Sequence, residues 1–205
     1  MLCLMTTAPL PKPRKNAGAS RDSEATRARI LEAAQVHFSR NSFEGVGLRD
    51  LARDASVDPA LVIRYFGSKE GLFREVASQA FGTEDFLQPP LSAMPARVAA
   101  LLLGPANQEA WRSGYNPLRV LLCSIGSPVA GPILAEYLDR DFIEPLAMAM
   151  RGAQADERGV ALAAQILGFA LIRVALDERE GAAARLNALH PLLLNSLEGL
   201  VEGQR

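Results

Sequence analysis

The spacing of hydrophobic residues in the first third of the chain is helical. Ile30 and Phe38 lie on one face of a run over residues 23–40, because apolar side chains recur there every three or four positions. Polar residues and glycine interrupt the run over residues 41–45, and apolar residues resume at Leu48. The pattern predicts one long helix and a second helix that is too short to be stable alone.

Capping residues predict two further helices. Asp58 precedes Pro59, the arrangement favoured where a helix begins, and this pair predicts a helix over residues 59–65. Ser68 is a second N-cap and predicts a helix over residues 69–81. The second and third helices, joined by a short turn, match a helix-turn-helix, in which the later helix enters a DNA major groove. An ordinary helical bundle is the alternative.

The same segment resembles the DNA-binding domain of the tetracycline-repressor (TetR) family. The matching residues are Thr26, Arg27, Ile30, Leu31, Ala33, Ala34, Phe38, Phe43, Arg49, Leu51, Ala52, Val57, Tyr65, Phe66, Ser68, Lys69, Leu72 and Phe73. The resemblance implies an all-α protein, with an N-terminal three-helix helix-turn-helix domain and a larger C-terminal helical domain for ligand binding and dimerisation. We expect a disordered basic arm over residues 1–20, the DNA-binding domain with the fourth helix over 21–82, and the regulatory and dimerisation domain over 83–205.

Four positions depart from the family pattern. The family has Ser or Thr near Val46 and Gly47, Gly at Ser56, and a phosphate-binding Tyr at Ile63. The missing hydroxyls remove possible phosphate hydrogen bonds, although backbone N–H groups at the start of the second helix still face a phosphate. Ser56 has to adopt the turn geometry that Gly supplies, at a modest strain cost.

The resemblance implies that the third helix reads a near-palindromic operator in double-stranded DNA. We expect its solvent face to contact base edges, with Arg64 as the candidate guanine reader. Arg49, Tyr65 and Lys69 are expected to hold phosphates. The expected DNA-binding set is Gly47, Leu48, Arg49, Asp58, Pro59, Ala60, Leu61, Ile63, Arg64, Tyr65 and Lys69.

The charge distribution agrees with DNA binding by the N-terminal part of the chain. The whole chain has a formal net charge of -1, but residues 1–82 hold 12 Lys and Arg against 9 Asp and Glu, and the remainder holds 10 against 14. Lys12, Arg14 and Lys15 lie in an N-terminal segment without apolar periodicity. That arm either follows phosphates or a minor groove, or serves only as a solubilising tail.

Composition predicts a cytoplasmic protein without a membrane partner, and the family resemblance implies that it is bacterial. The apolar start of the chain is too short for a signal peptide, and no later run reaches membrane length without charge. Cys3 and Cys123 offer no disulfide framework. The 205 residues are 49% hydrophobic, enough for a small DNA-binding module and a larger helical domain.

The second half of the chain stays helical in its periodicity. Breaks at proline and glycine predict helices over residues 91–103, 107–113, 117–124, 129–150, 156–176 and 181–202. Pro145 is expected to kink the fourth of these helices. This half resembles a regulatory-domain subtype common in actinobacterial family members, through residues 117–128, 142–150 and 168–176.

The last two predicted helices are candidates for a homodimer interface. The first has small residues on several faces, which lets helices approach closely, and the second has an apolar surface wider than one core contact requires. In the family, the last two helices of each subunit form a four-helix interface, and a two-fold partner doubles the DNA site. The expected interface residues are Ala164, Gly168, Leu189, Leu193 and Leu197. A core within one subunit is the alternative.

The resemblance also implies a small-molecule pocket whose occupation moves the two DNA heads, with the fourth helix as the lever. The candidate pocket residues are Trp111, Tyr115, Arg119, Cys123, Leu138, Phe142, Met148 and Arg173. The two arginines in this set suggest an anionic or carbonyl-bearing ligand. An ion pair across the dimer, with Asp177 or Glu178, is the other role for Arg173.

The sequence lacks the combinations of residues that catalysis requires. The chain has two histidines, and it shows neither a nucleophile beside a base, nor zinc-ligand spacing, nor a glycine-rich phosphate loop. We expect His37 to be a packed core residue and His190 to lie in the dimer region, and we expect no cofactor or metal. The prediction is a homodimeric repressor released by a small molecule. An activator, or a regulator without such an effector, remains open.

Overall fold

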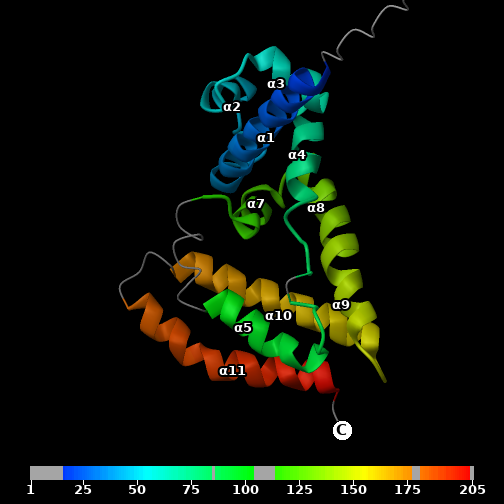
Figure 1. Cartoon of the computed structure of the whole chain (residues 1–205). Coiled ribbons are helices and arrows are strands. Elements are labelled where there is room, and N and C mark those ends of the chain that lie inside the picture. Colours follow the sequence, from blue (N-terminus) through cyan, green and yellow to red (C-terminus); the bar gives the residue numbers. More distant parts are fainter. Residues whose placement is uncertain (1–15, 85, 104–113, 177–180, 204–205) are drawn as a thin grey trace, which may run out of the picture.

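The computed structural model describes residues 16–84, 86–103, 114–176 and 181–203, and every element in these ranges is helical (Figure 1). The helices are α1 Asn16–Arg40, α2 Leu48–Asp54, α3 Pro59–Phe66, α4 Lys69–Ala77, α5 Met94–Leu103, α7 Pro117–Ser124, α8 Ala130–Leu138, α9 Glu144–Ala149, α10 Ala155–Leu176 and α11 Ala182–Glu202. A 3-10 turn, Leu91–Ala93, precedes α5, and a π turn, Asp139–Ile143, joins α8 to α9.

Helices α1 to α4 pack around three aromatic rings and form the head, the domain expected to bind DNA. Phe73 of α4 lies edge-on to Phe38 of α1 and to Phe43 of the following loop, with ring centroids 4.9 and 5.2 Å apart. All three rings are buried, and edge-to-face pairs of this kind stabilise a core beyond their buried area. The cluster fixes α4 against α1, so that α2 and α3 lie at the end of the molecule remote from α11 (Figure 1).

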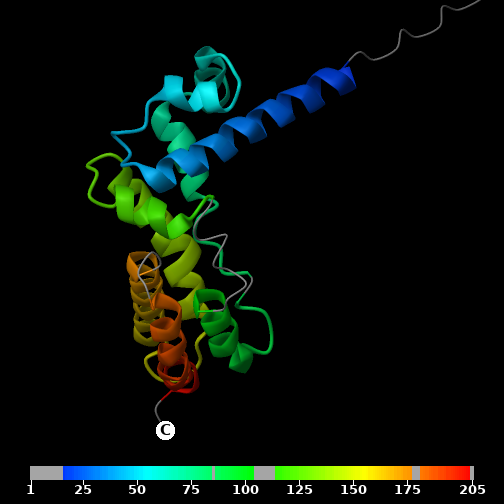
Figure 2. The same ribbon diagram turned by 90° about the vertical axis from the view of Figure 1, so that its left-hand side faces the viewer.

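Helix α10 is the centre of the larger domain. It contacts α5, α7, α9 and α11, and its Leu162, Ala163 and Ile166 are buried. Figures 1 and 2 show α5, α10 and α11 side by side, with the α8–α9 column beside them and α7 between this layer and α1. By length and composition alone α10 could cross a membrane, but its contacts with four helices identify it as the core helix of this domain.

Several predicted boundaries were wrong. Helix α1 begins at Asn16, inside the segment expected to be disordered, because no proline lies between Pro13 and Arg40 to stop a helix from extending through this alanine-containing sequence. Helix α4 ends at Ala77, before the expected residue 81. The helix expected over 107–113 lies outside the described residues. Helices α2, α3, α5, α7, α10 and α11 lie at their predicted positions.

The proline in the helix expected over 129–150 produces a π turn. The backbone N–H of Glu144 bonds to the carbonyl of Asp139, five residues back. Pro145 follows in the first turn of α9. A proline has no N–H and its ring clashes with the carbonyl four residues back, so the wider turn accommodates it where an α-helical turn does not.

Candidate DNA-binding surface and regulatory cavity

Helix α3 is built to present its first turn to a partner. The Asp58 carboxylate accepts a hydrogen bond from the Ala60 N–H at 2.7 Å, Pro59 occupies the first turn, and Gly67 ends the helix with a φ of 77°. Val62 is fully buried and anchors the helix to the head. The residues of the expected set that α3 and its cap expose are Asp58, Pro59, Ala60, Ile63 and Arg64, and Leu61 is half-buried.

Two arginines on this face are available to DNA. Arg49 on α2 and Arg64 on α3 are exposed, and neither has an ion pair or hydrogen bond with any residue that the structure describes. Arg53, by contrast, pairs with Asp50 at 2.9 Å. Gly47 is the N-cap of α2 and makes no side-chain cap, so the N–H groups of this first turn remain available to a phosphate, with Leu48 half-buried beneath them.

Tyr65 and Lys69 make contacts within the head, and their role in holding phosphates stays a prediction. The Tyr65 hydroxyl is 3.1 Å from the Ser23 hydroxyl of α1. The Lys69 ammonium lies 4.7 Å from the centre of the Phe43 ring and donates to the Glu44 carbonyl at 3.4 Å. Partial burial lowers the pKa of Lys69, and the nearby Glu44 carboxylate opposes that shift. Tyr65 therefore joins α3 to α1, and Lys69 joins α4 to the loop that follows α1.

The positions that depart from the family pattern have distinct environments. Ser56 adopts a φ of 55°, in the left-handed region that glycine occupies at no steric cost. Val46 is buried in the head, while Ile63 is 44% exposed on the DNA face. An exposed isoleucine suits a thymine methyl group and cannot replace the phosphate hydrogen bond of a tyrosine.

His37 is not the purely packed residue that we expected. Its ring nitrogen lies 2.7 Å from the Asp54 carboxylate, joining α1 to the end of α2. The hydrogen bond with His37 is the main reason that the pKa of Asp54 lies below its usual range. His190 is half-buried on α11. The described residues contain no group of three or more metal-ligating side chains, so neither histidine belongs to such a group.

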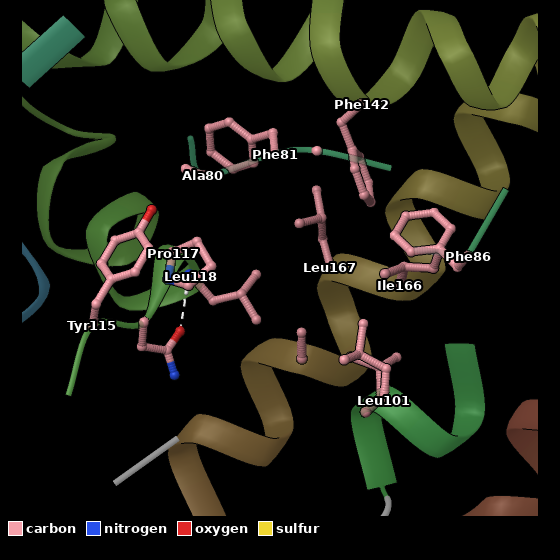
Figure 3. Close-up of a pocket in the computed structure, with 14 residues that line it drawn as sticks. Ala80, Phe81, Phe86, Leu101, Tyr115, Pro117, Leu118, Phe142, Ile166 and Leu167 are labelled. Atoms are coloured by element: carbon pink, nitrogen blue, oxygen red, sulfur yellow. Dashed lines mark hydrogen bonds between the residues drawn. The ribbon is translucent and has the colours of Figure 1, made fainter. Parts of the chain in front are cut away.

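A cavity of about 310 Å³ lies where the head meets the larger domain (Figure 3). It is lined by Ala80, Phe81, Gly82, Phe86, Leu101, Leu102, Tyr115, Asn116, Pro117, Leu118, Phe142, Ile166, Leu167 and Ala170. In the close-up, Tyr115 stands at one end of the cavity, and Phe86 and Phe142 stand at the other. The size lies within the usual range for small-molecule pockets.

The cavity contains two of the eight expected pocket residues, Tyr115 and Phe142. Met148 is 85% exposed on α9, because the π turn sets the rotation of that helix. Arg173 is 1% exposed and donates to the Leu102 carbonyl. Asp177 and Glu178, its expected ion-pair partners, lie outside the described residues. Trp111 also lies outside those ranges. The remaining three, Arg119, Cys123 and Leu138, do not line the cavity.

Two hydrogen bonds connect the cavity wall to α1, a link that sequence reasoning missed. The Ser39 hydroxyl accepts from the Asn116 N–H at 3.0 Å and lies 3.2 Å from the Asn116 carbonyl oxygen. Both residues are buried. The Asn116 side chain also caps α7, accepting from the Leu118 N–H at 3.0 Å. The Asn-Pro pair at 116–117 repeats the cap-plus-proline pattern of α3, which signals the cap of α7 but not the bond to Ser39.

Two further contacts join the head to α8. The Arg74 guanidinium of α4 lies 2.9 Å from the Glu136 carboxylate. The Ser127 hydroxyl donates to the Glu44 carboxylate and accepts from the Ala130 N–H at 3.0 Å, at the start of α8. The bond from Ser127 is the main reason that the pKa of Glu44 lies below its usual range. The head is thus attached to the larger domain at three places, and one of them, Asn116, lies on the cavity wall.

The expected dimer residues divide into two groups. Leu193 and Leu197 are fully buried within the subunit, where α11 packs against α5 and α10, so their assignment to the dimer interface was wrong. Leu189 is half-buried in the same core. Ala164 is exposed and Gly168 half-buried on α10. The sequence showed that α11 is apolar on more than one face, but not which face the chain itself covers.

Comparison with known proteins agrees with the geometry. The protein-family model described as bacterial regulatory proteins, tetR family, matches residues 30–76. The family model of the tetracyclin repressor-like C-terminal domain matches residues 89–201. The chain is 33% identical over 190 residues to the HTH-type transcriptional regulatory protein RaaS of Mycobacterium tuberculosis, covering 86% of this chain and 85% of RaaS. It is 41% identical over 58 residues to the HTH-type transcriptional repressor SCO4008 of Streptomyces coelicolor, covering 28% of this chain and 30% of that protein.

Two solved structures share the fold. The TetR-family regulator SCO0857 of Streptomyces coelicolor superposes with a TM-score of 0.53 at 24% identity, covering 88% of this chain and 96% of that one. NalD, the secondary repressor of the MexAB-OprM multidrug efflux pump in Pseudomonas aeruginosa, gives a TM-score of 0.59 at 21% identity, covering 85% and 96%. The chain therefore belongs to the TetR family of bacterial regulatory proteins and is a helix-turn-helix transcriptional regulator, not an enzyme.

Proposed function

We propose that the protein is a homodimeric repressor that binds a two-fold symmetric operator and leaves it when a small molecule occupies the cavity. The observation that carries this proposal is the composition of the cavity wall. Residues 80–82, directly after α4, and residues 115–118, at the start of α7, both line the cavity. A ligand there touches both segments that connect the DNA head to the larger domain.

Self-association is supported by the exposed apolar surface of the last two helices. Val160 and Leu171 on α10 are about half exposed, Ala164 lies between them on the same face, and Leu192 on α11 is 63% exposed. Exposed apolar residues gathered on neighbouring helices mark interaction surfaces. A two-fold dimer through this surface places two copies of α3 in successive major grooves, about 34 to 36 Å apart.

Release requires that a ligand bind one arrangement of the heads better than the other. The hydrogen bonds between Ser39 and Asn116 carry a displacement of α7 directly into α1. The ion pair between Arg74 and Glu136 carries movement of α8 into α4. Helix α1 is thus coupled to the cavity through Asn116 on its wall, and α4 through α8, which leads into the π turn that holds Phe142 of the wall. We propose repression rather than activation because SCO4008 and NalD are both named as repressors.

The test is a fluorescence anisotropy titration of an operator fragment in the presence of a metabolite panel, with melting of the DNA-free protein in parallel. A compound at 100 times its dissociation constant should add roughly 2.7 kcal/mol of stability. We expect a compound that stabilises the free protein also to dissociate the complex. A compound that strengthens operator binding would contradict release. Absence of any effect across a broad panel would favour a regulator without a small-molecule effector.

A further inference from the structure

We propose that the cavity accepts a neutral, largely apolar molecule with one hydrogen-bond acceptor, and that the Tyr115 hydroxyl selects it by donating to that acceptor. The inference rests on the proposed function only in taking this cavity as the regulatory site. It concerns the chemical class of the ligand, which is set by the walls.

The walls are uncharged. Every described residue that lines the cavity is apolar or neutral, and the side chains that enclose it are mostly aromatic and aliphatic (Figure 3). Phe86 and Phe142 meet edge to face, with ring centroids 6.0 Å apart, and form one end. Apolar walls of this kind bind by removing ligand surface from water. They favour rings or short hydrocarbon segments.

A charged ligand finds no counter-charge among the described residues that line the cavity. The arginines expected to orient an anion, Arg119 and Arg173, are absent from the lining, and the Arg173 guanidinium is directed to the backbone carbonyl of Leu102. Moving an ionised carboxylate or ammonium from water into such a site costs far more than burial of its apolar part returns. The cavity therefore discriminates against ions of either sign.

Tyr115 supplies a polar group that the fold leaves unused. Its hydroxyl is buried and has no hydrogen-bond partner among the described residues. Burial also raises the pKa of this phenol, so the group stays protonated and remains a donor. The other polar side chain on the wall, Asn116, uses its amide oxygen to cap α7, accepting from the Leu118 and Arg119 N–H groups, and its amide NH2 group is a second donor on the wall.

An unpartnered buried hydroxyl is destabilising until a ligand satisfies it. The hydroxyl has almost no accessible surface in the free protein, so the Tyr115 ring has to turn toward the cavity for a ligand carbonyl or ether oxygen to accept this hydrogen bond. An isosteric hydrocarbon gains no such bond. The expected discrimination between the two is roughly 3-fold to 10-fold in dissociation constant.

Three probes with one skeleton test the inference: benzophenone, which has a carbonyl, diphenylmethane, which lacks it, and 4-benzoylbenzoate, which adds a carboxylate. Binding to the full-length, DNA-free protein is measured by equilibrium dialysis. We expect benzophenone to bind best, diphenylmethane roughly 3-fold to 10-fold more weakly, and 4-benzoylbenzoate more weakly than benzophenone by at least about tenfold. Tyr115→Phe should abolish the preference for benzophenone over diphenylmethane.

The matched control is Tyr137→Phe, because Tyr137 on α8 stacks with Arg140 and does not line the cavity. It should leave all three affinities unchanged. Irradiated benzophenone locates the site independently of any variant, since its excited ketone oxygen takes a hydrogen from a nearby C–H group and its carbon bonds to the carbon left behind. Labelled peptides should contain residues 80–86 or 115–118.

Three results would overturn the proposal: 4-benzoylbenzoate binding as tightly as benzophenone, an unchanged preference in Tyr115→Phe, or no saturable binding or labelling at the cavity by the neutral probes. Operator binding is measured on the same preparation without probe. Intact operator binding with any of these results rejects the ligand class alone, whereas loss of operator binding rejects the regulatory function.

Discussion

Replacing Ser39 with alanine should loosen the attachment of α1 to the cavity wall. Ser39 is 1% and Asn116 3% exposed, and the Asn116 N–H donates to the Ser39 hydroxyl oxygen at 3.0 Å. In Ser39→Ala this N–H stays buried without a partner. The same hydroxyl also donates to the Gln35 carbonyl at 2.7 Å, a bond that the helix backbone does not need.

The magnitude follows from these contacts. A buried donor left unsatisfied costs about 1 to 3 kcal/mol. Alanine is the better helix former and returns a few tenths of a kcal/mol, so the free energy of unfolding should fall by about 1 to 2 kcal/mol. Because the lost bond lies between α1 and α7, the change should be concentrated there and not spread over the head.

Chemical denaturation gives the change in stability, and amide hydrogen exchange gives its location. In Ser39→Ala we expect faster exchange at Asn116, with the exchange of the α2 and α3 amides unchanged. Ser78→Ala is the matched control, since the Ser78 hydroxyl donates only to the Glu75 carbonyl on the exposed end of α4. The control should change stability by less than about 0.5 kcal/mol. Equal stability of Ser39→Ala and wild type, with Asn116 still protected, would refute the reasoning.

Three further predictions follow from single contacts. Arg64→Ala should weaken operator binding by about 1 to 3 kcal/mol in a competition assay, while Arg140→Ala, in the larger domain, should not; equal affinities would remove Arg64 from base reading. Leu192→Glu should yield monomers in sedimentation analysis because a charge would enter the interface, and Met148→Glu should not; dimers in both would place the interface elsewhere. Ser56→Gly should raise the free energy of unfolding by about 0.5 to 1 kcal/mol by relieving a φ of 55°, and a lower melting temperature would contradict that strain.

The sequence predicted the features that depend on interactions between residues close together in the chain. The caps at Asp58 and Ser68 act within three residues, so the starts of α3 and α4 follow from sequence, and both caps are confirmed by their side-chain hydrogen bonds. Proline and glycine placed the bounds of α7, α10 and α11 for the same reason. The family resemblance rested on this locally determined head.

The sequence did not predict which face of each helix meets which neighbour. Met148 was expected in the pocket and is exposed because a π turn sets the rotation of α9. Leu193 was expected between subunits and is buried under α5. The bond between Ser39 and Asn116 joins residues 77 apart in sequence, and no local pattern marks it. Pocket and interface depend on such long-range packing.

Selection of genomic DNA fragments by the purified full-length protein, at stated salt and with competitor DNA, tests the central claim most directly. The account predicts enrichment of a near-palindromic site whose half-sites lie in successive major grooves, protected symmetrically in footprinting. Weak, salt-sensitive binding without sequence preference would contradict it, because it would mean that the head no longer reads an operator.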